Sequence, residues 1–409
     1  MSTSAAGVVI VGAGQAGYQC AESLRKEGYE GVITLIGDEE YPPYQRPPLS
    51  KSYLLGELDK LRLQFRARDY YAQHDISLLT GTSVKAIDAE AHRITLANGD
   101  SLQYSKLVLS TGASVRRLNL PGAEAKGICY LKTIDDIERI EEQLAAARKI
   151  VIIGTGFIGL EFAAVARKLD KQVQVLGRAE RLLDRVVSPL LSNYFHQLHS
   201  DHGVAIAYNQ EVQAIELKDG KPESVLCADG SRYPADMVLV GIGSVANTEL
   251  AAAAGVECGQ GIVVDEDGAS SEIDIYAAGD CSAYHHPYSA QSSRLESVQN
   301  AVDQARAVAA HIAGHANPYN SVPWFWSDQY DSKLQIVGLS EGCDEVLIRG
   351  DMASGKFSLF HYRKGELRAI DSINKPADHM LGRKLLAAGI SPTAEQVVDT
   401  GFALKSLLN

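Results

Sequence analysis

The stretch Gly7-Val8-Val9-Ile10-Val11-Gly12-Ala13-Gly14-Gln15-Ala16-Gly17 decides the fold. It is an apolar, β-branched run that leads directly into a GxGxxG turn. Apolar residues at helical spacing follow from Ala16 to Leu24, and a second apolar run, Val32–Ile36, predicts another strand before Asp38. Strand, glycine turn, helix, strand and acid in this order form the dinucleotide-binding fingerprint of a βαβ unit.

Each part of this turn has its own physical task. Gly12 allows the tight turn, Gly14 lets the backbone approach a diphosphate, and Gly17 lets the helix pack against the strand. The diphosphate is expected at the helix N-terminus, where backbone N–H groups and the helix dipole favour negative charge. Asp38 is expected to bind the ribose hydroxyls.

The same pattern occurs a second time. Lys149–Ile153 predicts a strand, Gly154-Thr155-Gly156-Phe157-Ile158-Gly159 the turn, Leu160–Leu169 the helix and Val173–Leu176 the next strand. One such match is a weak signal, because glycine-rich turns are common, whereas two complete matches in one chain are a strong one. We expect one site for a tightly bound dinucleotide and one for a diffusible dinucleotide. The glycine turns alone do not say which is which.

The rest of the chain indicates more α/β structure and a small third domain. Strands are expected at Arg232–Gly243, at Gly261–Asp265 and within Ile275–Asp280. Ser297 is expected to cap a helix whose apolar face consists of Val298, Ala301, Val302, Ala305, Val308, Ala309 and Ile312. After a linker at Ala313–Val322, short strands and then one helix are expected at Leu334–Leu339, Glu345–Arg349, Lys356–Tyr362, Glu366–Ser372 and His379–Ala388. The predicted fold class is α/β, with two Rossmann-like dinucleotide-binding domains and a smaller α+β C-terminal domain.

Composition excludes several classes of protein. The length of 409 residues predicts two or three domains at roughly 150 residues each. Lys and Arg number 39 against 51 Asp and Glu, and a net charge of −12 argues against binding nucleic acid or an anionic membrane. No apolar run reaches the roughly 18 residues of a membrane span. The N-terminus has no basic region before its apolar run, so we expect no signal peptide and a cytoplasmic location.

The cysteines and histidines give no metal signature. Six cysteines never approach CxxC spacing, which argues against a zinc site, an iron–sulfur cluster or a redox disulfide of short spacing. We expect all six to be buried thiols in a reducing compartment. His285 and His286 are adjacent, so their side chains face apart, and no metal site is expected there.

Further motifs accompany the two fingerprints. They are Pro47–Lys51, Leu107–Ala113, Gly154–Glu161, Gly279–Cys281, Glu296–Ala301 and Pro323–Gln329. With them, essentially the whole chain resembles the FAD-dependent, NAD(P)H-linked ferredoxin reductases that serve bacterial oxygenases. These are relatives of the glutathione reductase fold without its redox disulfide.

The resemblance implies that the first fingerprint holds FAD and the second holds NAD(P)H. The residues it assigns to FAD are Gly12, Gly14, Ala16, Gly17, Asp38, Lys51, Val84, Thr111, Gly112, Lys132, Asp280, Val298 and Trp326. The residues it assigns to NAD(P)H are Gly154, Gly156, Ile158, Gly159, Glu161, Gly177, Arg178, Gly241, Gly243 and Glu296. Lys132 stands where many relatives have Arg, which replaces a fork of donors by a point charge.

The resemblance also implies a catalytic pair. Lys51 would lie beside the hydride-accepting nitrogen of the flavin and pair with Glu161. The alternative is a solvated Lys51 after a proline turn and a Glu161 favoured only by the helix dipole. The helix that begins near Val298 would stabilise the negative charge of the reduced flavin. Trp326 would contact the flavin near its exposed edge, and the alternative is an ordinary core tryptophan.

Electrons are expected to leave through the flavin edge. The flavin itself supplies the hydride chemistry, and Cys20 has no partner cysteine four or five residues away. The implied acceptor is a [2Fe–2S] ferredoxin that feeds a ring-hydroxylating dioxygenase or haem monooxygenase, as in aromatic hydrocarbon catabolism. Ferredoxins are usually acidic, so a local basic patch is expected, with Arg306 and Lys333 as candidates. The alternative makes both ordinary surface residues.

The chain departs from the family pattern after its second fingerprint. Most relatives have an acid there that binds the NADH ribose, whereas Val173–Leu176 runs into Gly177 and Arg178, with Arg181 nearby. Arginine can pair with a 2′-phosphate, although Gly159 is the choice typical of NADH sites. We expect use of both NADPH and NADH. The alternative is that Arg178 is a solvated bystander.

The resemblance also predicts the domain boundaries. The FAD domain is expected in two parts, 1–117 and 246–319, with the NAD(P)H domain, 118–245, inserted between them and a C-terminal domain at 320–409. Two other functions stay open at this point. One is an NAD(P)H oxidase that passes electrons directly to dioxygen, and the other is a redox-sensing flavoprotein.

Overall fold

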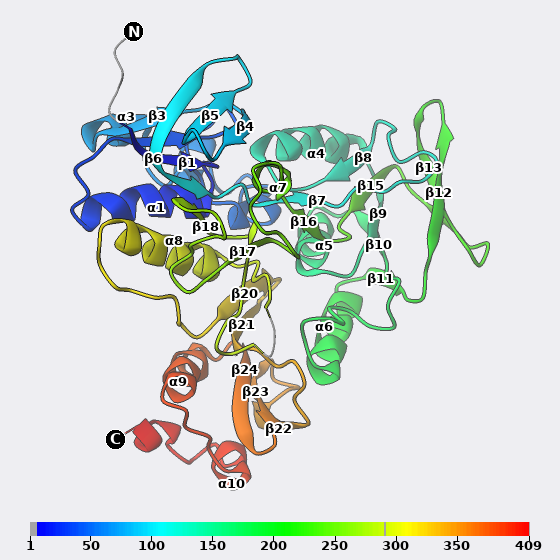
Figure 1. The fold of residues 1–409 in the computed structure, drawn as a ribbon. Helices are drawn as coiled ribbons and strands as arrows, with labels where there is room; N and C mark the ends of the chain where they lie inside the picture. Colours follow the sequence, from blue (N-terminus) through cyan, green and yellow to red (C-terminus); the bar gives the residue numbers. More distant parts are fainter. Residues whose placement is uncertain (1–5, 290–291, 409) are drawn as a thin grey trace. The chain divides into compact units, whose positions relative to one another are not determined.

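The computed structural model describes residues 6–289 and 292–408. The chain forms two compact units (Figure 1), each made of segments distant in sequence. The first unit consists of Met1–Gln45, Lys60–Ser114 and Ala246–Phe325. The second consists of Arg46–Asp59, Val115–Val245 and Trp326–Asn409. The domain boundaries expected from the sequence stay a prediction.

The first unit is built on a sheet with a parallel centre. The strand order is β3-β2-β1-β6, with β18 also parallel to β6, and β5 and β4 continue from β6 in antiparallel pairing. Every residue of β1 is buried, as expected for a central parallel strand covered on both faces. The strand bounds are β1 Gly7–Val11, β2 Ile33–Ile36, β3 Ile76–Leu79, β4 Val84–Asp88, β5 Arg93–Leu96, β6 Ser101–Leu109 and β18 Ile275–Ala277.

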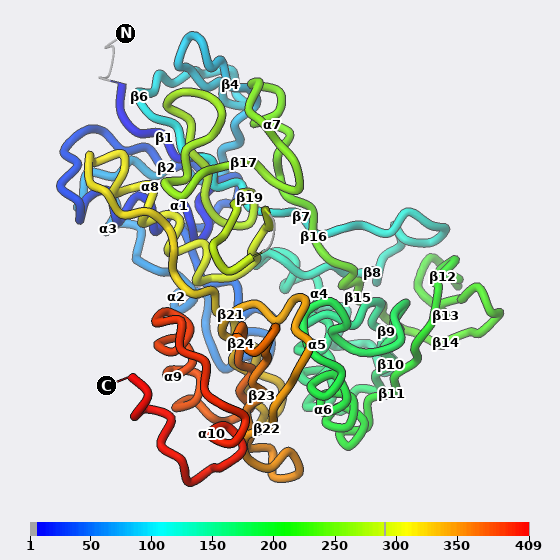
Figure 2. The backbone as a smooth tube through the Cα atoms, turned by 60° about the horizontal axis from the view of Figure 1, so that its bottom comes forward, coloured from blue at the N-terminus to red at the C-terminus, as the bar shows by residue number. Residues whose placement is uncertain are grey.

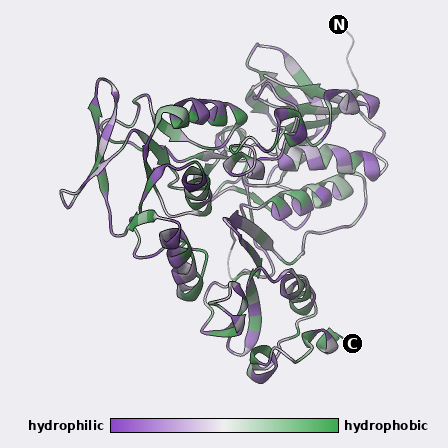
Figure 3. Ribbon diagram, turned by 180° about the vertical axis from the view of Figure 1, so that it is seen from behind, coloured by the Kyte–Doolittle hydropathy of each residue, from purple (hydrophilic) through white to green (hydrophobic). Residues whose placement is uncertain are grey.

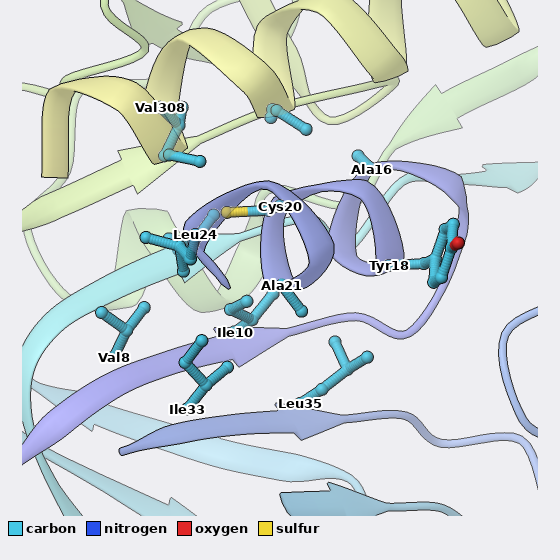
Figure 4. Packing of buried hydrophobic residues seen from close by; sticks show 14 of the residues in the cluster. Val8, Ile10, Ala16, Tyr18, Cys20, Ala21, Leu24, Ile33, Leu35 and Val308 are labelled. Atoms are coloured by element: carbon cyan, nitrogen blue, oxygen red, sulfur yellow. The ribbon is translucent and has the colours of Figure 1, made fainter. Parts of the chain in front are cut away.

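Two helices of small residues pack together over this sheet. They are α1 (Gln15–Lys26) and α8 (Val298–Ile312). Figure 4 shows Cys20 and Leu24 of α1 between Val308 of α8 and the strand residues Val8 and Ile33. Cys20 and Leu24 are completely buried. The expected N-cap is confirmed, because the Ser297 hydroxyl accepts a hydrogen bond from the Asn300 N–H at 3.0 Å.

The second unit has its own parallel sheet, in the order β11-β10-β9-β15-β8. Its strands are β8 Ile128–Tyr130, β9 Lys149–Ile153, β10 Gln172–Leu176, β11 Val204–Ala207 and β15 Met237–Val240. Its helices are α4 Ile134–Ala146, α5 Phe157–Lys168 and α6 Pro189–Asp201. The strand β1 in the first sheet and β9 in the second each lead into a glycine turn and a helix. The two fingerprints therefore occupy equivalent places in two sheets, which confirms the predicted α/β class.

The C-terminal residues form an antiparallel sheet in the order β20-β21-β24-β23-β22. Figure 2 shows α9 and α10 beside it in red. The bounds are β20 Trp324–Gln329, β21 Ser332–Gly338, β22 Glu345–Asp351, β23 Lys356–Arg363, β24 Glu366–Ile373, α9 Pro376–Ala387, α10 Ala394–Val398 and η2 Leu404–Leu408. One hydrophobic cluster joins α5 and α6 to this sheet, with Leu160, Phe195, Phe357 and Leu359 completely buried.

The remaining elements are short. They are η1 Pro47–Ser50, α2 Lys60–Leu63, α3 Arg68–Gln73, β7 Ala113–Val115, β12 Val212–Lys218, β13 Lys221–Cys227, β14 Arg232–Pro234, β16 Ser244–Ala246, α7 Glu249–Ala253, β17 Ile262–Val264 and β19 Ser282–Tyr284. The helices carry both hydrophilic and hydrophobic residues (Figure 3), as amphipathic helices do. None of the helices within the described ranges is long and apolar enough to cross a membrane.

Two expectations were wrong in detail, and one strand was missed. The single strand expected at Arg232–Gly243 is two strands, because the chain turns between β14 and β15, where the Asp236 carboxylate accepts from the N–H groups of Arg148 and Lys149. The strand β20 was not predicted. Cys258 and Cys343 are only half-buried, whereas Cys20, Cys129, Cys227 and Cys281 are buried as expected.

We predict that Leu24→Ala lowers the free energy of unfolding by about 2–5 kcal/mol, because it opens a cavity between α1 and the sheet. Urea unfolding followed by circular dichroism, with saturating FAD throughout, measures the change. The control is Leu61→Ala, since the Leu61 side chain is exposed and its truncation should change stability by less than about 0.5 kcal/mol. Equal effects of the two substitutions would contradict the role of this core.

Candidate functional site

The first glycine turn leaves space for a ligand at one position only. Gly12 has φ +111°, and a Cβ on it would lie 2.1 Å from the carbonyl oxygen of Ser110. A Cβ on Gly17 would lie 1.9 Å from the carbonyl oxygen of Gly12. Gly14, in contrast, faces open space. Protein packing therefore explains the first and last glycines, and the middle one keeps a surface open, as close approach of a diphosphate requires.

The second turn repeats this arrangement. Gly154 has φ +119°, and its Cβ would lie 2.1 Å from the carbonyl oxygen of Gly241. A Cβ on Gly159 would lie 3.2 Å from the Gly154 oxygen, while Gly156 faces open space. Two turns of the same design, each at the end of a central parallel strand, indicate two binding sites of the same kind.

The helices after these two turns have no side-chain N-cap, whereas four other helices have one. Gly14 and Gly156 are the N-cap residues of α1 and α5, and neither helix has a side-chain cap or an acidic residue in its first turn. By contrast, Thr133, Ser188, Ser297 and Thr393 cap α4, α6, α8 and α10 with their hydroxyls. An uncapped, positively polarised helix end beside an open glycine fits the diphosphate of a dinucleotide.

Opposite charges follow the second strand of the two units. Gly37 comes after β2, and its Cβ would lie 2.6 Å from the Cβ of Ala13; Gly177 comes after β10, and its Cβ would lie 2.5 Å from Cγ2 of Thr155. Gly37 and Gly177 are therefore equivalent, and the next residues are an exposed Asp38 and an exposed Arg178. The first turn presents a carboxylate where the second presents a guanidinium.

Arg181 is used inside its own loop. Its guanidinium donates to the carbonyl oxygen of Val187 at 2.7 Å and to that of Asp184. It is therefore less available for a ligand than Arg178, a difference that sequence proximity did not reveal.

A side chain that the sequence analysis missed supports the Thr111–Gly112 turn. The Asn247 amide donates to the Thr111 carbonyl oxygen at 2.8 Å, and the Thr111 hydroxyl donates to the Asn247 carbonyl oxygen at 2.7 Å. Gly112 and its counterpart Gly243 both have positive φ. These turns follow β6 and β15, the strands next to β1 and β9, so they lie at the edge where parallel sheets bind ligands.

Gln304, also missed, supports the Gly279–Asp280 turn. Its amide oxygen accepts from the Gly279 N–H at 2.9 Å, the Ser282 hydroxyl at 2.8 Å and the Asn300 amide at 3.1 Å. The sequence signal that would have found it is a polar glutamine among the small apolar residues on one face of α8. Asp280 is half-buried beyond this turn, and Val298 is half-buried in the first turn of α8.

One group of polar contacts in the second unit centres on the Glu161 carboxylate. It is buried, and the Lys51 ammonium lies 2.6 Å from its Oε2. The Ser50 hydroxyl donates to the same oxygen at 2.5 Å, and the Ser327 hydroxyl donates to Oε1 at 2.7 Å. A buried carboxylate is costly unless it is paired and hydrogen-bonded. The two serines, which the sequence analysis did not select, supply those bonds, and the alternative of a solvated Lys51 does not describe this structure.

The other selected residues lie at strand ends, turns and surfaces. Ile158 is exposed, whereas Val84, Lys132 and Trp326 are half-buried, and the Arg46 guanidinium donates to the Lys132 carbonyl oxygen at 2.9 Å. Ala16 is buried in the first turn of α1. Glu296 forms an ion pair with Arg294.

The two candidate partner-binding residues differ from each other. Arg306 is exposed but lies 3.3 Å from the Asp303 carboxylate, so part of its charge is offset. Lys333 is exposed on β21. Within the described residues, no group of three or more His, Cys, Asp or Glu side chains is placed to hold a metal ion.

The chain matches two protein-family models. Residues 6–305 match the pyridine nucleotide-disulphide oxidoreductases, and residues 324–408 match the reductase C-terminal domain. Rhodocoxin reductase of Rhodococcus erythropolis is 46% identical, covering 97% of this chain and 93% of the relative.

Solved structures agree with this match. The crystal structure of the ferredoxin reductase for the CYP199A2 system from Rhodopseudomonas palustris superposes with a TM-score of 0.97 at 44% identity, covering 99% of this chain and 100% of the other. The covalent putidaredoxin reductase–putidaredoxin complex gives a TM-score of 0.95 at 40% identity, covering 98% of each chain. We call each open glycine turn, together with the uncapped helix end beside it, a cradle. The two cradles and these matches lead to the same conclusion: the chain belongs to the pyridine nucleotide-disulphide oxidoreductases that carry the reductase C-terminal domain, and its cofactors are FAD and NAD(P)H.

Proposed function

We propose that this chain is an NAD(P)H:ferredoxin reductase that passes single electrons to a [2Fe–2S] ferredoxin of an oxygenase system. The observation that carries the proposal is the combination of two open glycine cradles with the buried Lys51–Glu161 pair and no disulfide among the cysteines. The similarity to rhodocoxin reductase and to a reductase crystallised with putidaredoxin supports the choice of acceptor. The terminal enzyme is proposed to be a ring-hydroxylating dioxygenase or a haem monooxygenase.

The two cradles take different cofactors in this proposal. Asp38 follows the first cradle and binds the ribose hydroxyls of FAD. The FAD site is completed by Lys51, Val84, Thr111, Gly112, Lys132, Asp280, Val298 and Trp326. The second cradle takes NAD(P)H with Ile158, Glu161, Gly177, Arg178, Gly241, Gly243 and Glu296. FAD, when bound, accepts a hydride from NAD(P)H and releases its electrons one at a time.

The Lys51–Glu161 pair orients the reactants in this proposal. Glu161 holds the Lys51 ammonium at 2.6 Å, so the positive charge has one position instead of the many available to an exposed lysine. A fixed ammonium presented to the flavin stabilises the negative charge that develops there on reduction. The N-terminus of α8, capped by Ser297, adds a second positive potential from its dipole.

The cysteines are not proposed as electron carriers. Burial raises the pKa of the Cys20 thiol to about 12, so this thiol stays protonated at neutral pH and is a poor nucleophile. Electrons would therefore pass to the partner from the bound FAD and not through this thiol. Free thiols and a diffusible nicotinamide cofactor support a cytoplasmic location.

We predict that Glu161→Gln and Lys51→Met each slow the reduction of bound FAD by about tenfold or more, because the fixed charge at the flavin is lost. Stopped-flow absorbance at saturating NAD(P)H measures the rate. Glu223→Gln, on an exposed strand residue of the same unit, is the matched control and should leave it unchanged. A wild-type rate in both site variants would rule out this role for the pair. Fast NAD(P)H oxidation in air without ferredoxin would instead favour the function of an oxidase. Tight complexes with the nicotinamide cofactor and very slow turnover would favour the function of a redox sensor.

We predict that NADPH and NADH both reduce the enzyme at comparable rates. Arg178→Ala should lower kcat/KM for NADPH by about tenfold and leave that for NADH nearly unchanged, because the guanidinium pairs with the 2′-phosphate. Arg185→Ala, at an exposed position in the loop that follows, is the control. If Arg178→Ala affects both donors equally, or NADPH does not reduce the enzyme, Arg178 is a bystander.

We predict that ferredoxin reduction slows as salt rises, because Arg306 and Lys333 attract an acidic partner through screened charges. Ferricyanide reduction serves as the control and should not depend on salt. Lys333→Ala should weaken the salt dependence more than Arg306→Ala, whose charge Asp303 already offsets. Identical salt responses with both acceptors would refute a basic docking patch.

A further inference from the structure

The hydrogen bonds of Glu161 do not end at Ser327. The Ser327 hydroxyl, which donates to Glu161 at 2.7 Å, accepts from the Gln329 amide at 3.1 Å. The Gln329 amide oxygen in turn lies 2.7 Å from Nε2 of His199. A continuous chain of three hydrogen bonds therefore joins His199 to the Glu161–Lys51 pair.

The members of this chain come from three elements of the second unit. His199 lies on α6, Ser327 and Gln329 on β20, and Glu161 on α5. Ser327 and Gln329 are two residues apart on a strand, so both side chains point to the same face. All four side chains are buried.

The orientation of the Gln329 amide, with its oxygen toward His199 and its nitrogen toward Ser327, sets the proton positions in the chain. The Gln329 oxygen can only accept, so Nε2 of His199 must carry the proton that it donates. The Gln329 nitrogen can then only donate to Ser327, which leaves the single hydroxyl proton of Ser327 for Glu161. Every bond donates toward the carboxylate. If the Gln329 amide turned over, Ser327 would donate to Gln329 instead, and Oε1 of Glu161 would lose this donor.

The surroundings of His199 favour the neutral ring whose Nε2 donates to Gln329. Its Nδ1 has no hydrogen-bond partner within the described residues, so no second bond competes for the ring orientation. Burial lowers the pKa of His199 to about 4, which keeps the ring neutral at physiological pH. At the C-terminal end of the same helix, the C-cap residue His202 is exposed and stacks on Tyr330 with ring centroids 3.7 Å apart, without joining the chain.

We propose that His199 is a positioning residue for electron transfer, which acts through Gln329 and Ser327 to hold the Glu161 carboxylate in the orientation that fixes Lys51. The inference rests on the proposed function of the Lys51–Glu161 pair. No proton moves along the chain, since the neutral Gln329 amide is not a relay. Its task is to keep one donor on Oε1, so that Oε2 stays directed at Lys51.

The test is a double-mutant cycle between the two ends of the chain. His199→Phe keeps a ring of similar size and removes the donor, and Ser327→Ala removes the last link. Each is expected to lower the limiting rate of FAD reduction by about fivefold, to leave KM for NAD(P)H unchanged and to shift the flavin absorption spectrum, because the charge beside the flavin loses its fixed position. The double variant should be no slower than either single variant, since both break the same chain.

Two further variants separate positioning from packing. Ser327→Thr keeps the hydroxyl and should retain most of the wild-type rate. His202→Phe, the matched control at the C-cap of α6, keeps the stacking on Tyr330 and should leave rate and spectrum unchanged. If His199→Phe does not fold, Gln329→Met, which interrupts the chain one link nearer to Glu161, takes its place in the cycle.

The outcomes distinguish this inference from the proposed function. If Glu161→Gln slows reduction but His199→Phe behaves like His202→Phe, or if the two ends of the chain have additive effects, His199 is structural and the inference is wrong. If Glu161→Gln itself leaves the rate unchanged, the proposed role of the pair fails, and the inference fails with it.

Discussion

Close approach of backbone to backbone is the constraint on which the two nucleotide-binding sheets depend. In both units a carbonyl oxygen, of Ser110 in one and Gly241 in the other, lies about where the first fingerprint glycine would carry a Cβ. No side chain fits there, so the turn, the next parallel strand and the following helix converge only with glycine. This convergence brings the helix N-terminus and two glycine-bearing strand ends to one edge of each sheet. The open space at Gly14 and Gly156, where we propose the diphosphates, lies beside that packing.

A buried negative charge imposes the second constraint. The Glu161 carboxylate in the second unit is removed from water, so its oxygens must be satisfied by the protein. Two segments far apart in sequence meet this requirement, through Ser50 at the end of η1 with Lys51 directly after it, and through Ser327 on β20. The reductase C-terminal domain thus contributes directly to the hydrogen bonds that hold the Glu161 carboxylate in the second unit.

The two units also illustrate how a duplicated architecture diverges at low cost. Gly37 and Gly177 are packed in the same way against the residue after the first fingerprint glycine, so the geometry of the strand end is retained. Only the exposed residue that follows differs, as Asp38 in one unit and Arg178 in the other. An exposed side chain can change charge without disturbing the core, whereas a side chain on the glycine before it would collide with Ala13 or Thr155. Selection for a ribose diol or a phosphorylated ribose can therefore act on one position.

The sequence by itself determined what depends on local pattern. The two βαβ units, the N-cap Ser297 and the strands β21 to β24 of the C-terminal sheet follow from periodicity, glycine spacing and capping chemistry, and the bounds of these elements differ from the predicted ones by three residues at most. It could not distinguish a paired from a solvated Lys51, because the partner lies 110 residues away in the chain. It also gave no sign of Ser327, Gln329 and His199 as a connected set, nor of Gln304 and Asn247 as supports for turns. Those contacts join residues from different elements, and only the packing of helices against strands brings their donors and acceptors within hydrogen-bonding distance.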